Sequence, residues 1–152
     1  MKKLIALLFT ALAMTACSTA PRMSTADRLA LYQAHAGAPV NSFRLGHNFT
    51  WTSLGDEALA VWSGPNQGHL LEFRTRCTGL GFASRINITN SMSMVSARFD
   101  SVQIRTAPGA PLQSCRIWTI RPLDVRALND SKREIRNVEA VEREPGVTAE
   151  QE

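Results

Sequence analysis

The chain has 152 residues, 44% of them hydrophobic and 20% charged, a length that supports one domain with a modest core. Lys and Arg number 17 against 13 Asp and Glu, which gives a formal net charge of +4 without a dense basic run. The sequence has no internal repeat, which excludes a repeat architecture. It also lacks the glycine spacing of a phosphate-binding loop, so we predict no cofactor.

The first seventeen residues predict export. Lys2 and Lys3 supply a basic start, residues 4–13 form a short apolar run, and small residues precede Cys17. Such a segment is typical of a secretory signal and is too short for a membrane-spanning helix. The Cys at the cleavage point resembles the lipobox of bacterial lipoproteins, with Met14 where that class usually carries Leu. The resemblance implies lipidation of Cys17. The alternative is an ordinary secretory signal cut at a nearby Ala.

The lipoprotein resemblance implies a location in the bacterial cell envelope. Residues 1–16 would be the signal peptide, and residues 17–23 a lipidated tether whose six residues beyond the Cys reach about 20 Å when extended. Ser18 follows the Cys, which by resemblance to known sorting signals favours the periplasmic face of the outer membrane. We therefore expect a membrane partner through the lipid anchor, and no nucleic acid in that compartment.

Residues 24–129 predict a single β-rich domain. Ser24 and Asp27 form a capping box that opens a short helix, and Gly37 ends it. Strand patterns follow at residues 42–44, 48–52, 58–62, 69–75, 85–89, 95–105 and 115–121. Because no helical crossover separates them, parallel pairing is excluded. We predict a mainly β fold, a small antiparallel sandwich or partly open barrel of about six or seven strands, with a short N-terminal helix and a disordered C-terminal tail.

Charge is distributed unevenly along the chain. Residues 17–129 hold eleven Arg, no Lys and six acidic residues, whereas residues 130–152 hold four basic and seven acidic ones. The latter segment is poor in large apolar side chains and predicts a charged tail, a frayed helix followed by a disordered stretch. The basic charge of the domain would favour binding to an envelope protein or an anionic envelope component. Arg74 and Arg76, which share a face by strand alternation, are the candidate binding residues. The alternative is that arginine is scattered over a solvated surface through coding bias.

Cys77 and Cys115 remain as an even pair once Cys17 is assigned to the lipid anchor. In an oxidising compartment such a pair usually oxidises, and we predict a disulfide between them. A bridge across 38 positions would stabilise the fold by roughly 4 kcal/mol through loop-closure entropy. The alternative, a reduced metal-binding or nucleophilic pair, lacks the support of a Cys-x-x-Cys motif.

The sequence contains no recognisable catalytic or metal-binding motif. An envelope hydrolase would have to use Asp56, Asp100 or His69, yet these residues suit turns, caps and partly buried positions equally well. Met92 and Met94 would face the same side of a strand, and thioethers can hold Cu(I), although packing is the simpler role. The histidines lack paired-ligand spacing, so we predict no metal.

Three tryptophans have two interpretations. Trp51, Trp62 and Trp118 suit a sugar-binding cleft, and they equally suit the core of a small β domain. We favour the core. The sugar cleft stays open as the alternative.

Several segments together resemble a known family. They are Ala38-Pro39-Val40, Trp51 with Leu54-Gly55-Asp56, Val61-Trp62, Val95 to Asp100, and Cys115-Arg116-Ile117 continuing to Asp124. This series resembles an uncharacterised family of small exported proteins from Gram-negative bacteria, a domain of unknown function, over residues 28 to 128. The resemblance supports the disulfide and implies no activity, ligand or catalytic residue. We therefore expect a non-catalytic binding module on an envelope lipoprotein, with a hydrolase or a metal-handling lipoprotein as alternatives.

Overall fold

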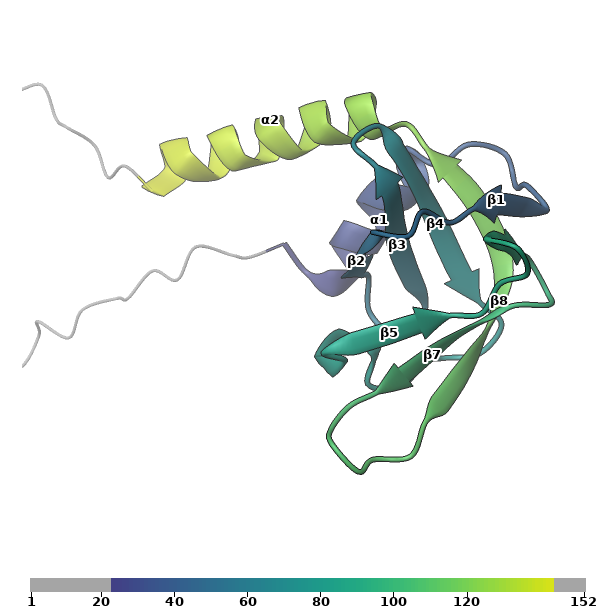
Figure 1. Ribbon diagram of the computed structural model, residues 1–152. Helices are drawn as coiled ribbons and strands as arrows, with labels where there is room; N and C mark the ends of the chain where they lie inside the picture. The colour runs from purple at the N-terminus through teal and green to yellow at the C-terminus, as the bar shows by residue number, and fades with distance from the viewer. Residues whose placement is uncertain (1–22, 144–152) are drawn as a thin grey trace, which may run out of the picture.

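The computed structural model describes residues 23–143, which contain eight strands and two α-helices (Figure 1). The strands are β1 (Ser42–Arg44), β2 (Thr50–Ser53), β3 (Ala58–Gly64), β4 (Gln67–Phe73), β5 (Arg85–Ile88), β6 (Met94–Ser96), β7 (Ser101–Arg105) and β8 (Gln113–Leu123). Six of them form a curled antiparallel sheet in the order β2-β3-β4-β8-β7-β5, and β1 pairs with β6. The predicted mainly β, antiparallel fold is confirmed, with eight strands in place of six or seven.

The core is divided into two clusters by the sheet. On β3 every residue from Ala58 to Val61 is buried, so this strand contributes side chains to both faces. Leu59 and Val61 belong to the larger cluster on the concave side, whereas Ala58 and Ala60 belong to the smaller cluster beneath the helices. The two faces of the sheet therefore have separate packing partners.

Helix α1 (Thr25–Ala34) begins at the predicted cap. Ser24 Oγ accepts a hydrogen bond from the Asp27 backbone N–H at 3.1 Å and donates one to the Asp27 carboxylate at 2.6 Å. Tyr32 is the buried residue of this helix and packs in the cluster beneath it. A short 3-10 turn, η1 (Leu80–Phe82), precedes β5.

Helix α2 (Val125–Arg143) shows that the frayed helix expected after residue 130 is a regular one that begins at Val125, so the disordered tail predicted from residue 130 is wrong as far as residue 143. The Asp124 carboxylate caps the helix by accepting from the Ala127 N–H at 3.0 Å, and Leu128 is fully buried against the domain. Ala, Glu, Arg and Lys then continue the helix because they lose little side-chain freedom in it. Figure 1 shows its later turns projecting beyond the sheet. Residues 144–152 lie outside the described residues.

The single strand expected over residues 95–105 is wrong, because the chain turns in its middle. Arg98 adopts a φ of 69°, and Asp100 holds the turn by accepting from the Ser96 N–H at 2.7 Å. A second tight turn precedes β6, where Met92 and Ser93 both have positive φ. Met92 is therefore 95% exposed in a turn and does not share a strand face with Met94.

The disulfide between Cys77 and Cys115 is confirmed, with 5.5 Å between their Cα atoms. Both residues are buried in the larger core cluster, so the bridge ties the chain after β4 to β8 inside the domain. Cys17, the predicted lipidation site, lies outside the described residues. Between residues 23 and 143 there is no helix with the length and apolar character needed to cross a bilayer.

Candidate functional site

Trp118 is exposed on β8, as alternation from the buried Cys115 and Ile117 places it, and the strand bulges at that residue. Glu72 of β4 pairs with Thr119, and the next residue, Phe73, pairs with Ile117, which leaves Trp118 as an extra residue in β8. The bulge shifts the alternation by one residue, so that Ile120 returns to the same core cluster as Ile117. The indole is 42% exposed, while Ile117 and Ile120 on either side of the bulge are fully buried.

Two arginines stack on this indole. The guanidinium carbon of Arg98 lies 5.0 Å from the ring centroid and that of Arg74 lies 5.2 Å from it. Guanidinium groups favour such contacts because the ring face carries negative potential. Within residues 23–143 neither arginine forms an ion pair with a carboxylate. Both charges are therefore available to a ligand.

The turn that carries Arg98 is held by hydrogen bonds on several sides. The Arg98 N–H donates to the Ile117 carbonyl at 2.8 Å, and the Arg116 guanidinium donates to the carbonyls of Arg98 and Phe99 at 3.0 and 2.8 Å. The positive φ of Arg98 costs a residue with a Cβ about 1 kcal/mol or more. Strain of this kind persists only where the surroundings impose it, and functional sites are a common location.

Phe99 adds an apolar side chain beside these charges. It is 80% exposed at the tip of the same turn. A groove of about 570 Å³ runs from Pro39–Ser42 past the turn to Trp118. We call Arg74, Arg98, Phe99 and Trp118 the Arg–Trp surface, and it combines two unpaired cations with exposed aromatic rings.

The two predicted binding arginines go to different places. Strand β4 ends at Phe73, so the strand alternation on which the expected shared face rests does not extend to Arg74 and Arg76. Arg74 joins the Arg–Trp surface, whereas Arg76 lies 3.9 Å from the Asp56 carboxylate. The shift in apolar spacing from Cys115 and Ile117 to Ile120 is the sequence signal that could have predicted the bulge and the exposed Trp118.

The tryptophans are divided between the two interpretations. Trp51 packs against the larger core cluster, as predicted. Trp62 packs against the smaller cluster and also lines a pocket between helix α2 and strands β2 and β3. Trp118, by contrast, is a surface residue.

The candidate catalytic residues serve separate local structures. Asp100 accepts from the Thr89 hydroxyl and the Ser96 N–H, and Asp56 accepts from the Gly79 N–H at 3.3 Å. His69 stacks on Phe43 with ring centroids 4.2 Å apart, its Nδ1 is buried without a hydrogen-bond partner, and desolvation by burial lowers its pKa. No hydrogen bond or ion pair joins these three residues, and no cluster of His, Cys, Asp and Glu suited to a metal occurs between residues 23 and 143.

Comparison with other proteins places the chain in a family without assigning it an activity. No curated protein and no solved structure matches it significantly. A family model described as a family of unknown function, DUF6491, matches residues 1–139, which is most of the chain. The protein therefore belongs to the DUF6491 family of unknown function.

Proposed function

We propose that this protein is a lipid-anchored protein of the bacterial cell envelope whose β domain is a non-catalytic binding module. The Arg–Trp surface is the part that binds, and its target is the phosphate of anionic lipid headgroups. The observation that carries this assignment is the stacking of Arg74 and Arg98 on the exposed Trp118. The lipobox at Cys17 supports the anchor.

Stacking prepares the two arginines for phosphate. A guanidinium that lies on a ring keeps its N–H donors at the edges, where they can meet phosphate oxygens in a bidentate arrangement. The ring also restricts the long side chains before binding, which lowers the entropy lost when the complex forms. Each arginine near an anionic membrane surface contributes about 1 kcal/mol.

The aromatic side chains favour a lipid surface over a soluble anion. Phe99 projects from the turn beside Arg98, and an exposed phenyl ring gains free energy by entering the boundary between headgroups and acyl chains. Tryptophan is favoured at the same depth because its ring has an apolar body and a polar N–H. A short tether after Cys17 would keep this surface within reach of the bilayer.

The experiment uses the chain isolated from its own membranes and reconstituted into vesicles with a spin label on the lipid headgroup. We expect stronger quenching of tryptophan fluorescence in vesicles that contain phosphatidylglycerol than in purely zwitterionic ones. The variant Trp118→Phe should abolish the difference, since Trp51 and Trp62 lie elsewhere. Mass spectrometry of the same sample should give an acylated chain that begins at Cys17, and an unmodified chain would refute the anchor separately.

A matched pair of double variants separates a site from a general charge effect. Arg74→Gln/Arg98→Gln should reduce the lipid-dependent quenching by more than half. Arg105→Gln/Arg126→Gln removes the same charge from two other exposed arginines and should leave it intact. An equal loss of lipid-dependent quenching in the two double variants, or quenching that is independent of anionic lipid, would overturn the headgroup assignment.

A further inference from the structure

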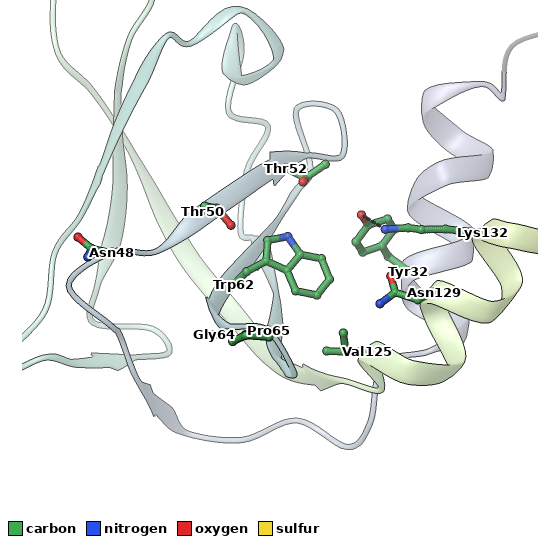
Figure 2. A pocket seen from close by; sticks show the side chains of 10 residues that line it. All are labelled: Tyr32, Asn48, Thr50, Thr52, Trp62, Gly64, Pro65, Val125, Asn129 and Lys132. Atoms are coloured by element: carbon green, nitrogen blue, oxygen red, sulfur yellow. Dashed lines mark hydrogen bonds between the residues drawn. The ribbon is translucent and has the colours of Figure 1, made fainter. Parts of the chain in front are cut away.

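A second site lies where helix α2 meets the β2–β3 edge of the sheet. It is a pocket of about 470 Å³, within the size range of small-ligand sites, and Figure 2 shows its side chains converging from both sides. The sheet contributes Thr50, Thr52 and Trp62, and the helices contribute Tyr32 and Lys132. We call it the aromatic–lysine pocket.

Trp62 is held in a fixed orientation by a glycine. A Cβ on Gly68, its partner across the β3–β4 pair, would lie 2.5 Å from the indole, so the ring packs directly on the strand backbone. Tyr32 approaches the same indole edge-on, with ring centroids 6.3 Å apart and planes at 61°. The pocket therefore presents an aromatic wall that is already in place before a ligand arrives.

Lys132 brings a positive charge to this wall. Its Nζ donates a hydrogen bond to the Tyr32 hydroxyl at 2.8 Å and lies 5.6 Å from the Trp62 ring centroid. Among the side chains described, those of residues 23–140, no carboxylate pairs with this ammonium, and no acidic residue lines the pocket. An ammonium group has three donors, so Lys132 retains donors for an anion.

Besides Gly64, Pro65 and Val125, the remaining lining residues carry side-chain hydroxyl and amide groups. Asn48, Thr50, Thr52 and Asn129 contribute them, and none of these side chains hydrogen-bonds to another side chain or backbone group in the described part of the chain. Hydroxyls and amides around an aromatic wall are suited to a hydroxylated ring, whose polar edges need partners and whose C–H face packs on an indole.

We propose that the aromatic–lysine pocket binds an acidic sugar. The sugar ring would pack against Trp62, its carboxylate would meet Lys132, and its hydroxyls would meet the Asn and Thr side chains. The charge-assisted contact with Lys132 selects the acidic sugar over a neutral one. This site shares no residue with the Arg–Trp surface and is independent of the function proposed above.

The test is isothermal titration of the full chain with glucuronate, compared with glucose and with acetate. We expect glucuronate to bind at least tenfold more tightly than either, because glucose lacks the charge and acetate lacks the ring. Lys132→Gln should weaken glucuronate at least tenfold and remove the preference over glucose. Trp62→Leu should weaken both sugars.

The control is Arg133→Gln, which removes the same charge from the neighbouring residue on α2, an arginine 3.6 Å from Asp130. It should bind glucuronate like the parent chain, and circular dichroism should show α2 intact in each variant. Three results would overturn the proposal. They are no glucuronate binding at millimolar concentration, acetate binding as tightly as glucuronate, and an equal effect of the Lys132 and Arg133 substitutions.

Discussion

The Arg–Trp surface takes its side chains from a bulge and a turn that the core holds, whereas the aromatic–lysine pocket closes only where helix α2 packs on the sheet. Cys77 follows Arg74 by three residues and Cys115 precedes Trp118 by three, so the disulfide fixes the chain on both sides of that contact. Lys132 depends instead on a helix whose later turns leave the domain.

The two sites therefore have separate sources of stability. The Arg–Trp surface should respond to changes in the concave core and in its own turn. The aromatic–lysine pocket should respond to the contacts that dock α2, chiefly those of Leu128 and Val125. Substitutions directed at one region should therefore leave the other site working.

The largest effect is expected from removal of the disulfide. Cys77→Ala/Cys115→Ala should lower the free energy of unfolding by about 4 kcal/mol, because the bridge closes a long loop in the unfolded chain. Urea denaturation measures the change. At urea concentrations where the variant is still folded, the lipid-dependent quenching of tryptophan fluorescence should weaken more than glucuronate binding does. A midpoint equal to that of the parent chain would contradict this prediction.

The next largest effect concerns the docking of α2. Leu128→Ala should cost about 3 kcal/mol, since Leu128 is fully buried and its loss leaves a cavity under the helix. Glucuronate binding should fall with the loss of helical circular dichroism, while quenching at Trp118 persists. Val138→Ala on the exposed part of α2 is the control and should change stability by less than about 0.5 kcal/mol. Parallel loss of both sites in Leu128→Ala would show that they are not separate.

A smaller effect is expected from Arg98→Gly. Glycine adopts the positive φ of this position without strain, which offsets the loss of the contact with Trp118, so stability should stay within about 1 kcal/mol of the parent chain. The same variant should lose much of the lipid-dependent quenching. If stability fell by several kcal/mol instead, Arg98 would be a structural residue.

The smallest effect is a pH dependence from the half-buried His69. Burial lowers the pKa of His69 below its ordinary 6.5, so the unfolded chain binds the proton more readily than the folded one. Stability should therefore be intact above about pH 6.5 and decrease as the pH falls below it. Thermal unfolding at pH 7.5 and 5.5 measures the difference, which His69→Phe should reduce and His47→Gln should preserve. An unchanged slope in His69→Phe would assign the effect to other groups.

Short-range patterns in the sequence were sufficient to predict much of the fold. The capping box at Ser24, the apolar strand runs of β3 and β4, and the even pair of Cys77 and Cys115 predicted a helix start, a β-rich domain and a disulfide, and the structure agrees. These features depend on residues close in sequence or, for the cysteines, on simple pairing chemistry. The lipid anchor at Cys17 stays a prediction from sequence.

Tertiary structure alone decided the two sites. The length of α2 depends on Leu128 finding a buried position on a distant sheet, whereas composition by itself indicated only a frayed helix followed by a disordered tail. The exposure of Trp118 agrees with alternation from the buried Cys115 and Ile117, but the two arginines that stack on it come from a turn and from the chain after β4, which only the tertiary structure brings there. The sequence therefore determined which side chains were available, while register and helix docking decided which of them meet, because both depend on long-range packing.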